Sequence, residues 1–258
     1  AALEAGKHVF VEKPLCYSLK EVDEMSALAV RNDLKVMIGY MKRYDPGYHY
    51  AKKRLLEMGE IRYVQINTLH PEEEGYLKIH GLIAADDVPA GVMQGSMIHD
   101  INALRGLVGE PERVLLAEHW PAGEKPGGIT TTIQYPGALR VVYTWIFLPE
   151  LRNYFQEIAL MSSTNRLRIQ FPSPYLRNFP TPVVVESMKD GAAVEEKVIV
   201  SYEEAFEQEL LAFYECVVSN RSPLTDLADA RRDIILLQQI LAALHPAGLG
   251  GEAAAKSG

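Results

Sequence analysis

The sequence predicts an α+β fold, in which a short β-α-β unit precedes a large, mainly antiparallel sheet. Two apolar, β-rich runs, at residues 8–11 and 35–38, flank a helical pattern. Further along, turn-forming Pro-Gly, Gly-Gly and Asp-Gly pairs separate segments rich in Val, Ile, Leu, Tyr and Thr. Strands that follow one another without intervening helices pair antiparallel. The segments are 113–120, 129–135, 138–147, 154–161, 166–171, 182–188 and 195–200.

Two helices are predicted in the N-terminal part. Ser18, with Glu21 three residues later, forms a capping box, and apolar residues recur at helical spacing through 22–29. This helix lies between the two apolar runs and completes the β-α-β unit. Pro46 fits the first turn of a second helix, and Gly59 ends it.

The C-terminal part predicts two more helices and a tail. Ser201 with Glu204 is a second capping box that begins one helix. Thr225 begins another, which runs to Leu244. Residues 249–258 are rich in Gly and Ala, and this composition indicates a flexible tail or a cloning linker.

Composition is typical of a globular protein. The 258 residues are 48% hydrophobic and 23% charged, which suffices for a sizeable core. A formal charge of -8 argues against nucleic acid or an anionic membrane as partner. Two distant cysteines, Cys16 and Cys216, form no disulfide framework, so a cytoplasmic location is expected. The sequence shows neither a secretory leader nor an apolar run long enough to span a membrane.

Three segments, in order along the chain, resemble motifs of one enzyme family. Glu12-Lys13-Pro14 ends the first apolar run, residues 39–46 read GYMKRYDP, and residues 99–111 read HDINALRGLVGEP. These segments resemble the glucose-fructose oxidoreductase, inositol dehydrogenase and rhizopine-catabolism (Gfo/Idh/MocA) family of nicotinamide-dependent sugar oxidoreductases. The resemblance extends over nearly the whole chain.

The resemblance implies an architecture and domain limits. The family has a nucleotide-binding Rossmann domain and a large open antiparallel sheet with helices packed on one face. Residues 1–40 are then a remnant of the nucleotide-binding domain, 41–248 a substrate and oligomerisation domain, and 249–258 the tail. A remnant of two strands would expose apolar faces and an unpaired edge. We therefore expect a homo-oligomer, a dimer or higher.

The family's glycine-rich cofactor turn is not found in the sequence. Family members hold NAD or NADP with a Gly-x-Gly-x-x-Gly turn, and no such motif occurs here. The sequence therefore indicates an N-terminally truncated member that lacks this half of the Rossmann domain and does not bind the cofactor in the standard way. Glu12 and Pro14, the latter in a tight turn with a cis peptide as one option, would contact a nucleotide only if one binds.

Lys13 and His99 are the catalytic positions that the resemblance implies. A lysine after an apolar strand can be partly desolvated, which lowers its pKa and lets it exchange a proton with a sugar hydroxyl. In the family the histidine acts with this lysine and with an aspartate four residues earlier, where this chain has Gly95. Asp100 is expected to be a cap or structural partner. The alternatives are a solvated lysine and a structural histidine.

The predicted long loop at residues 70–98, rich in acidic residues, Gly and Pro, offers a different function. Some subset of His70, Glu73, His80 and His99 could hold Zn²⁺ or Mn²⁺ and activate water, as in a hydrolase of esters or phosphoesters. Their spacing matches no metal motif, and acidic runs are usually solvated. Three functions stay open: a sugar or polyol oxidoreductase part acting on a small molecule, a metal-dependent hydrolase, and a non-catalytic oligomeric remnant.

Overall fold

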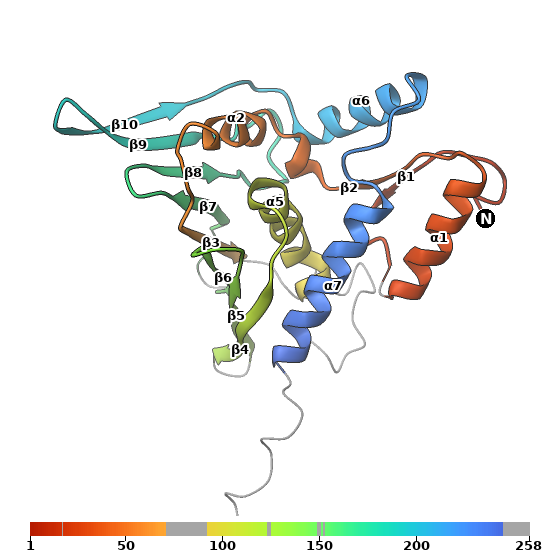
Figure 1. Cartoon of the computed structure of the whole chain (residues 1–258), viewed down its shortest axis with the longest axis horizontal. Helices are drawn as coiled ribbons and strands as arrows, with labels where there is room; N and C mark the ends of the chain where they lie inside the picture. The colour runs from red at the N-terminus through yellow and green to blue at the C-terminus, as the bar shows by residue number, and fades with distance from the viewer. Residues whose placement is uncertain (17, 71–91, 123–124, 149–150, 152, 245–258) are drawn as a thin grey trace, which may run out of the picture.

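The computed structural model describes residues 1–16, 18–70, 92–122, 125–148, 151 and 153–244, and in these it contains two sheets (Figure 1). The smaller is a parallel pair, β1 (Val9–Glu12) with β2 (Val36–Gly39), joined through helix α1 (Leu19–Arg31). The predicted β-α-β unit is therefore confirmed.

The larger sheet has eight strands in the order β10-β9-β8-β7-β3-β6-β5-β4. All neighbours in it are antiparallel except β3 and β6, which run parallel. This confirms the mainly antiparallel sheet. The strands are β3 (Tyr63–His70), β4 (Arg113–Ala122), β5 (Lys125–Gln134), β6 (Arg140–Phe147), β7 (Phe155–Met161), β8 (Arg166–Gln170), β9 (Val183–Lys189) and β10 (Ala192–Val198).

Helices cover one side of the large sheet. Figure 1 shows α2, α5 and α7 on the same side of it, as the family resemblance predicts. Helix α2 contacts β8 and β9, while α7 contacts β4, α5, β2 and α1. The remaining segments are the 3-10 turn η1 (Met41–Tyr44), α2 (Pro46–Leu55), the π turn η2 (Met93–Met97), α5 (Ile98–Val108), α6 (Ala205–Val218) and α7 (Leu227–Leu244).

A single hydrophobic core joins the two sheets. Strand β6 buries every second side chain, because successive residues of a strand point to opposite faces. Its buried residues belong to the same core cluster as Ile101 and Leu104 of α5, and this cluster also includes Val22 of α1 and Val36 of β2. The small sheet is thus held against the helical layer of the large one.

The first predicted capping box is confirmed and the second is wrong. Ser18 Oγ accepts from the backbone of Glu21, whose carboxylate accepts from the Ser18 backbone, both at 3.2 Å. In contrast, α6 begins only at Ala205. Ser201 Oγ accepts from the backbone of Glu203 at 3.0 Å, and the Glu204 carboxylate accepts from the backbone of Asn178 at 2.6 Å.

The predicted helix start at Thr225 is also wrong, because this residue pairs with β2. Its hydroxyl donates to the Ile38 carbonyl at 2.7 Å, and its own carbonyl accepts from Ile38 N at 2.9 Å. These bonds keep Thr225 outside α7, which begins at Leu227.

The predicted loop at 70–98 is wrong at its C-terminal end. The chain forms η2 from Met93 to Met97 and continues directly into α5. Both methionines are buried, at 1% and 0% exposure, so burial of this face favours the helical turn. Residues 71–91 and the tail 249–258 lie outside the described residues. No helix in the described ranges is long and apolar enough to cross a membrane.

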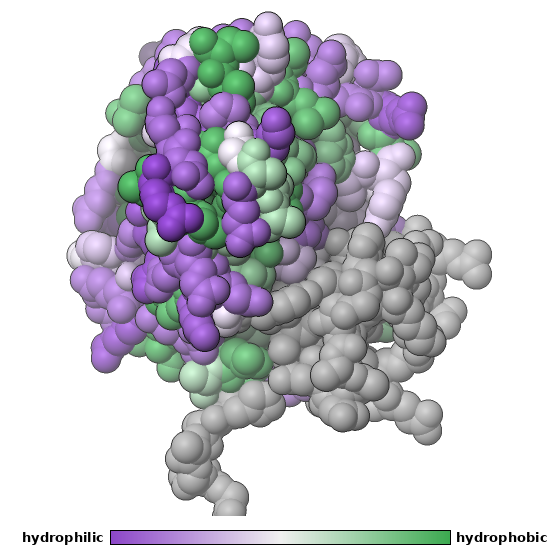
Figure 2. Space-filling view, turned by 90° about the vertical axis from the view of Figure 1, so that its right-hand side faces the viewer, coloured by the Kyte–Doolittle hydropathy of each residue, from purple (hydrophilic) through white to green (hydrophobic). Residues whose placement is uncertain are grey.

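Apolar side chains are exposed on the side of the molecule that carries α1 and α6. Figure 2 shows this side, with apolar residues among the polar ones. On α6 the exposed apolar side chains are Leu210, Leu211, Tyr214 and Val218. The homo-oligomer remains a prediction, and this side offers it apolar surface.

Candidate active site

Lys13 directly follows β1, at the carboxyl end of the small parallel sheet. This is the end at which open parallel sheets bind ligands. The Lys13–Pro14 peptide is cis, the option that the sequence left open. The Lys13 ammonium donates a hydrogen bond to the carbonyl oxygen of Gly95 at 2.5 Å. The end of β1 and the η2 turn therefore meet at this amine.

The surroundings of Lys13 make proton exchange easier. Its pKa is lowered from 10.5 to about 8, mainly because burial disfavours the ammonium and secondarily because the charge of Lys42 lies nearby. The carboxylates of Glu12 and Asp100 act in the opposite direction. With this pKa, both protonation states of Lys13 are populated at mildly alkaline pH.

His99 is the second residue of α5 and lies close enough to Lys13 to respond to its charge. Burial, then the charges of Lys13 and Lys42, hold its pKa well below the usual range, so the imidazole is neutral. No described residue bonds to its shielded Nδ1. The ring of Tyr40 stands edge-on to it, with 6.4 Å between centroids. A neutral imidazole here can exchange hydrogen bonds with a hydroxyl group.

Asp100 is fully buried, at 0% exposure. Its carboxylate forms an ion pair with the buried ammonium of Lys42. This ammonium also lies over the ring of Phe171, 5.0 Å from the ring centroid. The expectation that Asp100 is a structural partner agrees with these contacts. The carboxylate accepts from Lys42 Nζ at 2.6 Å, Thr68 Oγ1 at 2.8 Å, Tyr143 Oη at 2.5 Å and Gln156 Nε2.

Glu12 and Gly39 face each other at the ends of β1 and β2. A Cβ added to Gly39 would come within 3.0 Å of Glu12 Oε2, so the glycine leaves room for that carboxylate. Together with Pro14 these residues suit the nicotinamide end of a dinucleotide, the position that the resemblance implies.

The proposed metal ligands are not brought together by the described residues. Among the described residues, which do not include 71–91, no group of three or more His, Cys, Asp or Glu side chains could hold a metal ion. His70 ends β3 and has aromatic neighbours, stacking on Trp145 at 6.4 Å and meeting Tyr154 edge-on at 5.7 Å. Glu73 and His80 lie outside the described residues. Nothing described supports the hydrolase hypothesis.

Lys42 is a part of the site that was not predicted from the sequence. This lysine lies in the GYMKRYDP segment, next to the residues that carry the family resemblance. Its position in η1, directly after β2, was the available signal, because the segment after a parallel strand lies at the ligand-binding edge. Gln156 and Tyr143 gave no such signal, since buried strand residues usually serve the core.

Sequence comparisons relate the chain to oxidoreductases. A family model described as "Oxidoreductase family, NAD-binding Rossmann fold" matches residues 1–40. The uncharacterized oxidoreductase YrbE of Bacillus subtilis (strain 168) is 26% identical over 258 residues, covering 93% of this chain and 71% of that protein. The scyllo-inositol 2-dehydrogenase (NAD(+)) of the same strain is 33% identical over 110 residues, covering 42% of this chain and 30% of the enzyme.

A solved structure shares the fold. The UDP-N-acetylglucosamine 3-dehydrogenase GnnA from Acidithiobacillus ferrooxidans superimposes with a TM-score of 0.76 at 21% identity, covering 94% of this chain and 72% of that chain. The likeness therefore includes both the small parallel sheet and the large antiparallel one. Residues 1–40 thus match the Gfo/Idh/MocA family model, and the fold, the ordered motifs and the related sequences agree with the resemblance of the chain to that family.

Proposed function

We propose that the chain carries the substrate side of an NAD(P)-dependent oxidoreductase that interconverts a hydroxyl and a carbonyl group on a sugar or polyol. The observation that carries the proposal is the placement of Lys13 beside His99, with the amine fixed at the carboxyl end of the small sheet and its pKa lowered to about 8. The relative named scyllo-inositol 2-dehydrogenase, a polyol enzyme, supports the substrate class.

Lys13 is the residue that moves the proton. In the oxidation direction its neutral amine takes the proton of the substrate hydroxyl, and in reduction the ammonium returns it. The neutral imidazole of His99 holds the same oxygen by a hydrogen bond. A nicotinamide held beside Glu12 would supply the hydride acceptor in oxidation and the hydride donor in reduction. Burial and then the charge of Lys42 keep the Lys13 pKa low, while Asp100, the partner of Lys42, acts in the opposite direction.

The test combines nucleotide binding with turnover. The purified chain is titrated with NADH and NADPH by fluorescence and then assayed on a panel of inositols and aldoses. Lys13→Met should lower kcat by about 10²- to 10⁴-fold without weakening nucleotide binding. Lys20→Met on the exposed side of α1 is the matched control, because its side chain is 85% exposed. A chain that binds neither nucleotide and turns over no substrate contradicts the proposal.

A further inference from the structure

The π turn η2 presents a backbone oxygen to Lys13. A π turn is wider than an α-helical turn, and such turns often occur at functional sites. Its outer residues, Met93 and Met97, are buried, while the carbonyl of Gly95 between them accepts from the Lys13 amine at 2.5 Å. Gly95 is the position at which the family pattern has an aspartate. A main-chain carbonyl therefore contacts the lysine where the pattern expects a carboxylate.

A tryptophan of the large sheet is hydrogen-bonded to this turn. Trp145 Nε1 on β6 donates a hydrogen bond to Ser96 Oγ at 2.9 Å. The indole is 2% exposed and stacks on Phe147, with 6.4 Å between centroids and 10° between planes. Because β6 lies inside the sheet, between β3 and β5, the indole has a fixed position. Ser96, the neighbour of Gly95 in the chain, is thereby attached to the sheet.

We propose that the Trp145–Ser96 hydrogen bond positions the η2 turn so that the carbonyl oxygen of Gly95 tethers the amine of Lys13. Ser96 and Trp145 are then positioning residues, which act on the acid–base group without touching substrate. The inference deepens the proposed function and rests on it only for what the tethered amine does. The tether itself requires no substrate and no cofactor.

The tether has a measurable consequence, because it holds a long, flexible side chain in a shielded place. There the amine lies among the charges of Lys42, Glu12 and Asp100, with the neutral His99 beside it. A released lysine side chain extends toward water. Since burial is the largest cause of the lowered pKa, release should move that pKa from about 8 back toward 10.5.

Competitive acylation measures this titration without any assay of activity. Trace acetic anhydride is applied to the intact protein across a pH series, and peptide mass spectrometry follows acetylation of Lys13, with exposed Lys20 as internal reference. The variants are Ser96→Ala and Trp145→Phe, which remove opposite ends of one hydrogen bond. Trp120→Phe is the matched control, because it removes a similar bond in the same sheet, from Trp120 Nε1 to Thr130 Oγ1 at 3.2 Å.

We expect both test variants to reduce Lys13 acetylation about tenfold at mildly alkaline pH, as a pKa rise of roughly one unit requires. The double variant should match the single ones, because all remove the same bond. Trp120→Phe should match wild type. Circular dichroism confirms that each variant is folded, and Ser96→Ala, the smaller change, decides the matter if Trp145→Phe unfolds.

The outcomes separate the two proposals. A Lys13 titration that is unchanged, or shifted downward, in folded Ser96→Ala overturns the tether. A shift toward 10.5 in the variants of a chain that shows no nucleotide binding or turnover supports the tether and contradicts the proposed function. A wild-type Lys13 that titrates like Lys20 contradicts both.

Discussion

At the scale of the residue, removing the Asp100 carboxylate should reduce stability more than any other change in the site. Asp100→Asn would leave the ammonium of Lys42, 3% exposed, without a charged partner in a place where burial already lowers its pKa. Breaking one side of a buried ion pair typically costs about 3–5 kcal/mol. We expect the free energy of unfolding, measured by urea titration, to fall by about that amount.

Two further variants isolate the buried pair. Lys42→Met combined with Asp100→Asn should lose less stability than the sum of the single changes, because no unpaired charge remains. Asp23→Asn is the control, since its pair with Arg231 at 2.7 Å is exposed and should contribute much less to stability. A loss in Asp100→Asn no larger than in Asp23→Asn would show that the buried pair does not stabilise the site.

The predictability of the site also differs from residue to residue. Lys13 and His99 could be selected because each stands in a motif whose order along the chain is informative. The part played by Trp145 could not, because a tryptophan at an inward-facing strand position has the same sequence pattern whether or not its indole N–H has a partner. Only the pairing of β6 beside β3 brings it to the η2 turn.

At the scale of the element, α6 carries a glutamate in an apolar place. Glu209 is 1% exposed, and its Oε2 has no partner among the described residues. The helix is held on this side by Phe213, which meets Phe10 of β1 at 5.8 Å. Burial, and then the nearby charge of Glu12, raise the pKa of Glu209 from 4.5 to about 8.

This glutamate should make stability depend on pH. Since the folded state keeps the proton that the unfolded state loses, its contribution is complete below pH 4.5 and is lost as the pH rises to about 8. Glu209→Gln should remove that dependence and raise the free energy of unfolding at alkaline pH by roughly 2–4 kcal/mol. Urea titrations at mildly acidic and alkaline pH measure both effects.

An exposed glutamate on the same helix provides the control. Glu207→Gln should leave the wild-type slope of stability against pH unchanged, because the side chain is exposed. If the slope is the same in Glu209→Gln and in wild type, then Glu209 does not carry the proton that we assign to it.

Helix and strand positions were predictable where the local sequence decides them, as with the Ser18 capping box. They were not predictable where a distant segment competes, as Asn178 does for Glu204 and Ile38 for Thr225. The parallel pairing of β3 with β6 belongs to the second class, because order along the chain suggests antiparallel neighbours throughout.

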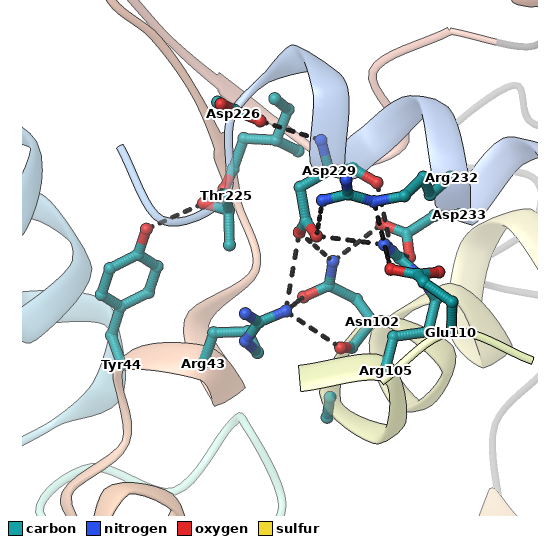
Figure 3. Close-up of polar contacts among 12 residues, drawn as sticks. Arg43, Tyr44, Asn102, Arg105, Glu110, Thr225, Asp226, Asp229, Arg232 and Asp233 are labelled. Carbon is teal, nitrogen blue, oxygen red and sulfur yellow. Dashed lines mark hydrogen bonds and ion pairs between the residues drawn. The ribbon is translucent and has the colours of Figure 1, made fainter. Parts of the chain in front are cut away.

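At the scale of the whole molecule, a buried polar network ties the segment after β2 to the helices on the large sheet (Figure 3). Arg43 of η1 and Arg105 of α5 both reach Asp229 of α7, at 3.6 Å and 3.2 Å. Asn102 donates to Asp229 and to Asp233, both at 2.7 Å. Arg105 also pairs with Asp233. Side chains of η1 and α5 thus bind the two carboxylates that α7 carries.

The network and the common core predict that the two sheets unfold together. Both tryptophans of the sequence lie in β4 and β6, so their fluorescence reports only the large sheet. Amide hydrogen exchange of β1 and β2 reports the small one. In urea the two probes should give one midpoint.

Arg105→Met tests this coupling, because it leaves Asp229 and Asp233 buried with less compensating charge. It should lower the free energy of unfolding by about 3–5 kcal/mol and move the midpoint of β1 and β2 below that of the fluorescence. Arg166→Met, which breaks a partly exposed pair with Glu186 at 3.4 Å, should keep the two midpoints together. Coincident midpoints in Arg105→Met would mean that the apolar core alone couples the sheets, whereas separate midpoints in wild type would show that they are independent folding units.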